Sequence, residues 1–165
     1  MPINIRVMQA VDVPVVAAIE NAIFPFPWGE QAFYDCLRVN FSAWVVEVDD
    51  ELTSAVEFQQ RSIVGYAIVM TVLDESELLN IAISPAHQGK QFGEYLLRFV
   101  LGQLWARGIK VVFLEVRKSN EIAKHLYQKL NFVEIGLRKD YYQTKEGRED
   151  AILYKCCLNY EEQGT

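Results

Sequence analysis

Residues 78–97 constrain the fold of this chain more than any other part of the sequence. They open with an apolar run, residues 78–83, which predicts a buried strand. Ser84-Pro85 ends that strand, because proline cannot donate a hydrogen bond to a neighbouring strand and restricts the residue before it. A polar loop with two glycines follows and leads into a helix with one apolar side, formed by Phe92, Tyr95, Leu96, Phe99, Val100 and Leu104.

A strand that leads through a glycine-containing loop into a helix is suited to binding an anion. The first helical turn leaves backbone N–H groups without intrahelical partners, and the helix dipole favours negative charge at that end. The sequence therefore predicts a ligand that carries phosphate.

Length, charge and hydropathy exclude several classes of protein. A chain of 165 residues, 51% of them hydrophobic and 23% charged, is typical of one globular domain with one core. We expect no membrane span and no signal peptide, because no apolar run is long enough and the N-terminus lacks a basic segment followed by an apolar one. We therefore expect a cytoplasmic protein.

The net charge of −6 argues against direct nucleic-acid binding, which needs a basic face, and it is compatible with a cationic substrate. The three cysteines, Cys36, Cys156 and Cys157, form no C-x-x-C pattern, and the chain has only two histidines. We therefore expect no metal site.

The hydrophobic pattern along the chain predicts a mixed α/β (α+β) fold with helices on both faces of one sheet. The expected order is strand, two helices, three strands, helix, strand, helix and two strands. Asp12 is expected to cap the first helix, and Ser119-Asn120 to cap the last one. Residues 52–61 are expected to form a long hairpin connection. The expected strands are 3–7, 41–48, 63–71, 78–83, 110–117, 132–137 and 151–158, and residues 74–77 are expected to form an acidic turn.

Glu115 lies in the middle of an otherwise apolar strand, where a carboxylate is costly unless it is paired or faces a cleft. Two readings stay open at this point: an ion pair with Arg117 or Lys110, or a functional carboxylate. Residues 24–28 are likewise open to two readings, an aromatic-proline turn packed on the core or one wall of a substrate cleft.

Four stretches in series resemble the acetyl-CoA-binding core of the GNAT superfamily of N-acetyltransferases. They are residues 80–85, Gln88-x-x-Gln91-x-Gly93, residues 114–120 and Leu126-Tyr127-x-x-Leu130-x-Phe132. Two flanking stretches, residues 26–28 near the front and residues 138–142 with 147–151 near the end, make the chain similar to the bacterial ribosomal-protein-alanine N-acetyltransferases. The resemblance implies a single GNAT-like domain over residues 1–165, with a mostly antiparallel sheet of about seven strands.

The resemblance also implies that acetyl-CoA is the cosubstrate and that an amine attacks its thioester directly in a ternary complex. Glu115 matches the general base of the family, acting through water, and Tyr127 matches the general acid that protonates the departing thiolate. From its helical position alone, Tyr127 would be read as a core residue. The positions that match cofactor-binding ones are Ile81, Ala82, Ile83, Gly89, Lys90, Gln91, Phe92, Gly93, Glu94 and Asn120.

Gln91 departs from the family pattern, which has glycine at this position. A glutamine with ordinary helical dihedral angles would be harmless, whereas a glycine-like backbone or a close phosphate would make it weaken CoA binding. We expect helical dihedral angles here.

The implied acceptor is a protein N-terminus, basic and most plausibly the N-terminal alanine of a small-subunit ribosomal protein. The matching residues that would contact this peptide are Phe26, Trp28, Tyr141 and Tyr142, with Asp74, Glu75, Glu149 and Asp150 able to attract basic groups. Two alternatives remain: a GNAT enzyme acting on lysine side chains or a small amine, and a catalytically silent acyl-CoA-binding module.

Overall fold

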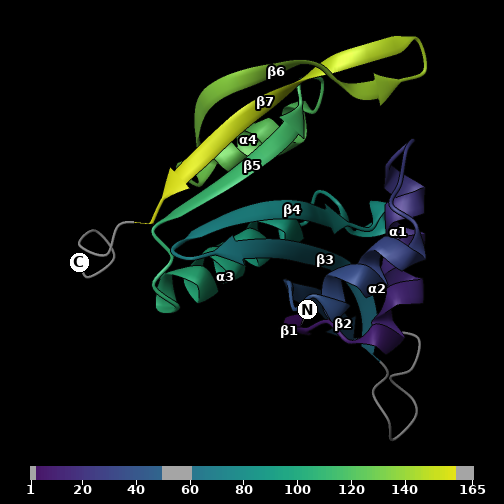
Figure 1. Ribbon diagram of the computed structural model, residues 1–165. Helices are drawn as coiled ribbons and strands as arrows, with labels where there is room; N and C mark the ends of the chain where they lie inside the picture. Colours follow the sequence, from purple (N-terminus) through teal and green to yellow (C-terminus); the bar gives the residue numbers. More distant parts are fainter. Residues whose placement is uncertain (1–2, 50–60, 159–165) are drawn as a thin grey trace, which may run out of the picture. The chain divides into compact units, whose positions relative to one another are not determined.

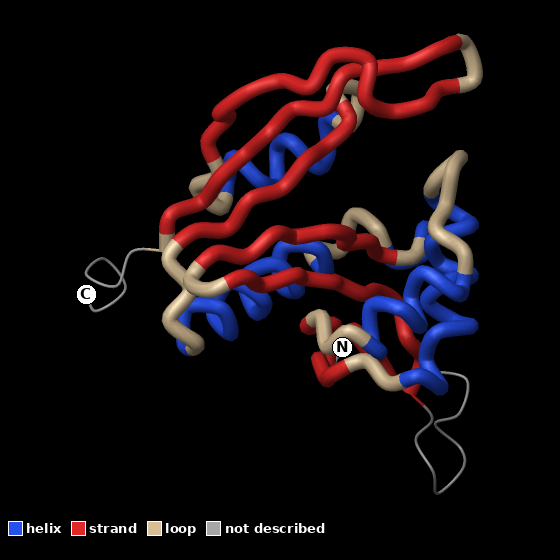
Figure 2. The backbone as a smooth tube through the Cα atoms, viewed as in Figure 1, coloured by secondary structure: helices blue, strands red, loops and turns tan. Residues whose placement is uncertain are grey.

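The computed structural model describes residues 3–49 and 61–158 (Figures 1 and 2). Within these residues lie seven strands and four α-helices, in the predicted order. The strands are β1 (Ile3–Val7), β2 (Ser42–Asp49), β3 (Arg61–Val72), β4 (Glu75–Ile83), β5 (Val111–Arg117), β6 (Val133–Thr144) and β7 (Gly147–Cys157). The helices are α1 (Val13–Ile23), α2 (Glu30–Arg38), α3 (Phe92–Ala106) and α4 (Glu121–Lys129), with short 3-10 turns at Ala10–Asp12 and Pro85–His87.

The strands form one sheet in the order β1-β2-β3-β4-β5-β7-β6. β1 pairs antiparallel with β2, and β7 pairs antiparallel with both β5 and β6. β4 and β5 run parallel, with Glu75–Leu78 opposite Val111–Leu114. A parallel pair needs a crossover, and the connection between these two strands contains α3.

Contacts divide the chain into two compact units. Unit 1 comprises the described residues of 1–68 and 80–96, and unit 2 those of 69–79 and 97–165. Each unit buries large side chains of its own: Val13, Val16, Phe33, Val45 and Tyr66 in unit 1, and Leu97, Leu104, Leu114, Phe132 and Tyr154 in unit 2. No helix of the described part is long and apolar enough to cross a membrane.

Three expected strand ends, one each in β4, β6 and β7, are wrong because sheet pairing extends these strands through polar sequence. β4 begins at Glu75, so most of the expected acidic turn at residues 74–77 is strand. The last two strands form a long hairpin that continues through residues 138–144 and 147–150, where loop was expected. The expected connection at residues 52–61 lies outside the described residues, except for Arg61.

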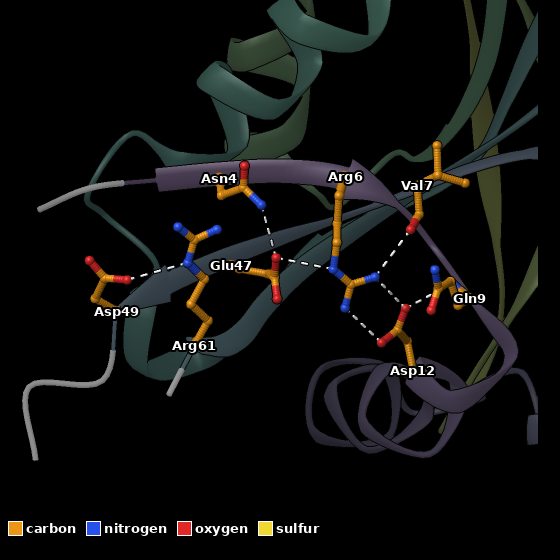
Figure 3. A network of polar contacts seen from close by, with 8 residues as sticks. All are labelled: Asn4, Arg6, Val7, Gln9, Asp12, Glu47, Asp49 and Arg61. Carbon is orange, nitrogen blue, oxygen red and sulfur yellow. Dashed lines mark hydrogen bonds and ion pairs between the residues drawn. The ribbon is translucent and has the colours of Figure 1, made fainter. Parts of the chain in front are cut away.

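Asp12 stands at the N-cap of α1, but its side chain makes no capping hydrogen bond. Its carboxylate instead accepts two hydrogen bonds from the Arg6 guanidinium, at 2.7 and 2.8 Å, and one from the Gln9 backbone N–H at 2.7 Å (Figure 3). Arg6 Nε also lies 3.0 Å from Glu47 Oε1, so one guanidinium joins β1, β2 and the start of α1. The hydrogen bond from Arg6 lowers the pKa of Asp12.

Replacing Arg6 by methionine is expected to lower the free energy of unfolding by about 3 kcal/mol, because two largely buried carboxylates would lose their cation. Chemical denaturation followed by tryptophan fluorescence measures the loss. Arg38→Met is the control, since the Arg38–Asp35 ion pair is exposed and should contribute less than about 1 kcal/mol. Equal effects of the two variants would contradict the prediction. Because the pKa of Asp12 is lowered, the wild-type stabilisation should fade as pH falls through that pKa.

Candidate active site

Glu115 lies in the middle of β5, opposite Leu153 of β7, and its side chain is 18% exposed. Arg138 of β6 donates from Nε to Glu115 Oε1 at 2.9 Å. Of the two open readings, the ion pair is present, but its partner is neither Arg117 nor Lys110. Arg117 instead contacts Glu149 at 3.0 Å, and Lys110 contacts Asp74 at 3.7 Å. Glu115 is thus a paired carboxylate in a polar cluster within unit 2.

An irregularity in the β6–β7 hairpin brings further side chains of β6 to this cluster. Arg138 pairs with Ala151 and Tyr142 pairs with Glu149, so three residues of β6 oppose one residue of β7. Asp140 sits inside this bulge with a φ of +53°, and its backbone N–H donates to the Asp150 carboxylate at 2.9 Å. A bulge changes which side chains face the same side of a sheet. Here, side chains from both ends of the bulge reach the same cluster.

Tyr141 is the last residue of the bulge and Tyr142 follows it, with ring centroids 5.0 Å apart in an edge-on arrangement. The Arg138 guanidinium lies 5.5 Å from the ring centroid of Tyr141, and that of Arg117 lies 4.5 Å from the ring centroid of Tyr142. The charge of Glu115 raises the pKa of Tyr141, and burial followed by the same charge raises the pKa of Tyr142 to about 12. Both phenols therefore remain neutral near pH 7 beside the carboxylate.

Tyr127 belongs to α4, which begins as predicted: the Asn120 side chain accepts a hydrogen bond from the Ala123 backbone N–H at 3.1 Å. Tyr127 is 6% exposed and packs against the rings of Phe132 and Tyr154, at 5.6 and 6.2 Å between centroids. Burial, and then the charge of Tyr142, raises the pKa of Tyr127. Its hydroxyl keeps its proton at neutral pH and can act as a donor.

Unit 1 contains the loop expected to bind phosphate. Gly89 and Gln91 both have left-handed backbones, with φ of +78° and +66°. The expectation of helical dihedral angles at Gln91 is therefore wrong, because α3 starts one residue later, at Phe92. A left-handed backbone costs a side-chain-bearing residue roughly 1–2 kcal/mol more than glycine. A glycine at this position, as in the family pattern described above, would adopt the left-handed backbone without that cost.

The backbone of Ile81, Ala82 and Ile83 forms the end of β4, where Ala82 and Ile83 are buried. Gly65 of β3, which the sequence analysis did not single out, approaches this segment closely. A Cβ added at Gly65 would lie 2.5 Å from Ile83 Cδ1 and 2.9 Å from the Ala82 carbonyl oxygen. Only glycine fits here without displacing this end of β4.

A buried carboxylate that the sequence analysis missed lies just before this segment. Glu20 of α1 is 2% exposed, and the Asn80 side-chain amide donates to both of its oxygens at 3.0 Å. The Trp28 backbone also hydrogen-bonds to Glu20, and burial raises the pKa of this carboxyl. Glu20 thereby fixes both the aromatic turn and β4 in unit 1. The sequence of α1 did not indicate that Glu20 is buried, because an acidic residue in a helix normally lies in solvent.

The four residues expected to contact the acceptor fall in different units. Phe26 and Trp28 belong to unit 1, and Tyr141 and Tyr142 to unit 2. Phe26 and Tyr141 are 47% and 46% exposed, and the Trp28 ring lies 5.3 Å from that of Phe33.

Three of the four acidic residues expected to attract basic groups have partners within their own unit. Asp74 pairs with Lys110, Glu149 accepts from Arg117 and from the Ser119 N–H, and Asp150 holds the bulge. Within residues 3–49 and 61–158, no group of three or more His, Cys, Asp and Glu side chains is arranged to hold a metal ion.

Comparison with known proteins decides the family. The sequence model of the Acetyltransferase (GNAT) family matches residues 13–132. The chain belongs to the GNAT acetyltransferase family. Among the relatives of this GNAT chain are the ribosomal protein bS18-alanine N-acetyltransferases of Escherichia coli K12 and Salmonella typhimurium LT2. They are 36% and 34% identical over 150 residues, which is 91% of this chain and 94% of each relative.

The fold comparison agrees with the family. The crystal structure of the ribosomal-protein-S18-alanine N-acetyltransferase from Escherichia coli superposes with a TM-score of 0.83 at 32% identity, covering 96% of this GNAT chain and 95% of that structure. The predicted family, the GNAT-like fold and the N-acetyltransferase activity are confirmed. Members of the GNAT family use acetyl-CoA.

Proposed function

We propose that this GNAT acetyltransferase transfers the acetyl group of acetyl-CoA to the N-terminal alanine of ribosomal protein bS18. The observation that carries this proposal is a proton acceptor and a proton donor in one unit: the largely buried Glu115 carboxylate and the buried Tyr127 hydroxyl. The names of the relatives from Escherichia coli and Salmonella support the acceptor. Modification of a ribosomal protein would place the enzyme in the cytoplasm.

The chemistry needs one proton removed and one supplied. An α-amine has a pKa near ~8, so most of it is protonated at neutral pH and cannot attack. In our proposal Glu115 accepts a proton of the amine, directly or through one water. Tyr127 donates its phenolic proton to the departing thiolate sulfur. The amine nitrogen forms the new bond to the acetyl carbon while the carbon–sulfur bond breaks.

The residues of the loop fit a phosphate-bearing cosubstrate. The Tyr95 N–H donates to the Gln91 carbonyl at 3.1 Å, so Phe92, Gly93 and Glu94 form the first turn of α3. The N-terminus of a helix presents backbone N–H groups to an anion. Together with Gly89, Lys90 and Gln91, the three residues of this turn would hold the pyrophosphate. When bound, acetyl-CoA supplies an acetyl thioester.

The backbone of Ile81, Ala82 and Ile83 would bind the pantetheine arm of acetyl-CoA as a strand binds its neighbour. Asn120 would contribute its side-chain NH₂ group, because its carbonyl oxygen already caps α4. We also propose that acetyl transfer by this chain needs no metal ion.

Replacing Gln91 by glycine is expected to tighten CoA binding about fivefold. Glycine removes the side chain together with its Cβ and leaves room for phosphate beside the loop, a gain of about 1 kcal/mol that corresponds to this factor. Isothermal titration with CoA measures the change. Gln91→Ala is the matched control, because alanine keeps the Cβ at positive φ and should give no gain. A gain that alanine reproduces would attribute the effect to the glutamine side chain instead, and an unchanged Kd for glycine would contradict the prediction.

The proposed acceptor contacts are Phe26, Trp28, Tyr141 and Tyr142. Phe26 and Tyr141 present nearly half of their surfaces to solvent. This exposure leaves both rings accessible to a bound peptide. A net charge of −6 favours an acceptor with a basic N-terminal segment.

Mass spectrometry of acetylated peptides tests the function. The full chain and acetyl-CoA are incubated with a peptide of the bS18 N-terminus, the same peptide with a blocked α-amine, a lysine-containing peptide and spermidine. We expect acetylation only on the free α-amine of the first peptide. Acetylation confined to lysine side chains or to spermidine would replace the proposal by the alternative of a lysine or small-amine acetyltransferase.

A further inference from the structure

We propose that Glu77 is a positioning residue of the acetyl-transfer site, whose carboxylate acts as a second anionic partner for Arg138 and so leaves Glu115 available to accept a proton. This inference rests on the proposed function, in which Glu115 is that acceptor. Glu77 belongs to the segment expected to be an acidic turn, which the structure shows to be the start of β4.

The register of the sheet brings Glu77 to the same face as Glu115. Glu77 pairs with Phe113 in the parallel β4–β5 ladder. Glu115 lies two residues further along β5, and side chains two apart on a strand point to the same face. Glu77 is half-buried on this face. Two long carboxylate side chains placed diagonally on neighbouring strands are close enough for their charges to interact, and Arg138 of β6 contacts the second of them, Glu115.

The charges of this cluster act on one another. Burial and then the charge of Glu115 raise the pKa of Glu77, whereas the charge of Arg138 lowers it. The charges of Glu115 and Glu77 raise the pKa of the Tyr141 phenol, whereas the charge of Arg138 lowers it. Burial and then the charge of Glu115 raise the pKa of the Tyr142 phenol. The phenols of Tyr141 and Tyr142 are neutral near pH 7. The charged groups of this cluster are therefore the carboxylates of Glu77 and Glu115, which compete for the Arg138 guanidinium.

This competition has a consequence for proton transfer. A carboxylate held only by an arginine is a weak base, because the cation stabilises its charged form and occupies an oxygen. The Glu77 carboxylate weakens that hold in two ways: it repels the charge of Glu115, and it offers Arg138 a second partner. The Arg138 side chain is 56% exposed, so its guanidinium can move between the two carboxylates without leaving a packed site.

The pH dependence of turnover distinguishes this role from a structural one. Glu77→Gln removes the repulsion between the two neighbouring carboxylates, so it should move the acidic limb of the kcat profile to lower pH by roughly 0.5–1 unit. This is the size expected for charges about 7 Å apart at an effective dielectric constant of about 40. The plateau rate should fall about threefold, because a weaker base transfers protons less well. Arg138→Gln should move the limb in the opposite direction.

A matched variant completes the test. Glu134→Gln removes the same charge from an exposed position of β6 and should leave the limb in place. An acidic limb that stays in place in Glu77→Gln would overturn the role of Glu77. An acidic limb that persists in Glu115→Gln would instead overturn Glu115 as the base.

Discussion

Glu115→Gln is expected to lower kcat at pH 7 by about 10²- to 10⁴-fold, the usual contribution of a positioned general base. Glutamine keeps the shape of the side chain and can still accept a hydrogen bond from Arg138, so the fold should persist. It cannot accept a proton. The deficit should shrink as pH rises above the pKa of the α-amine, near ~8, because more of the amine is then already deprotonated.

Steady-state acetylation of an N-terminal alanine peptide between pH 6 and 9.5 measures this effect. Asp35→Asn is a suitable control, since it removes one exposed carboxylate from α2 in the other unit and should leave the profile unchanged. Turnover of the glutamine variant close to wild type at pH 7 would remove Glu115 from its proposed role.

Tyr127→Phe is expected to slow acetyl transfer by about 10²-fold, at the lower end of general acid catalysis. The variant loses only the hydroxyl, and a phenylalanine ring can keep the contacts with Phe132 and Tyr154. The free energy of unfolding should therefore change by less than about 1.5 kcal/mol. The affinity for acetyl-CoA should change little, because the thiolate that needs the proton forms only during transfer.

Single-turnover kinetics with acetyl-CoA bound beforehand isolates the transfer step. Tyr154→Phe provides the comparison, because it removes a buried hydroxyl from the same ring cluster without touching the proposed donor. If both variants slow transfer equally, the loss reflects packing of the cluster. If neither does, another group protonates the leaving thiolate.

Much of the fold was predictable because its signals are local. The apolar run of β5, the apolar side of α3 and the cap at Asn120 depend on residues within a few positions of each other, and the structure contains all three. The ends of β4, β6 and β7 were not predictable, since polar residues become strand when a neighbouring strand supplies their hydrogen bonds. The single-domain organisation and the roles of the site residues stay predictions.

The sequence by itself determined the family and two chemically suited side chains, Glu115 and Tyr127, because the GNAT motifs are contiguous and ordered along the chain. Tertiary structure alone decided what surrounds them. Arg138 reaches Glu115 across 23 positions through the pairing of β6 with β7 and of β7 with β5, and Glu77 joins them through the register of a parallel pair. The strand–loop–helix at residues 78–97 shows the same division. Its elements follow from local pattern, whereas the left-handed backbone at Gln91 depends on where α3 starts, and composition cannot specify that position.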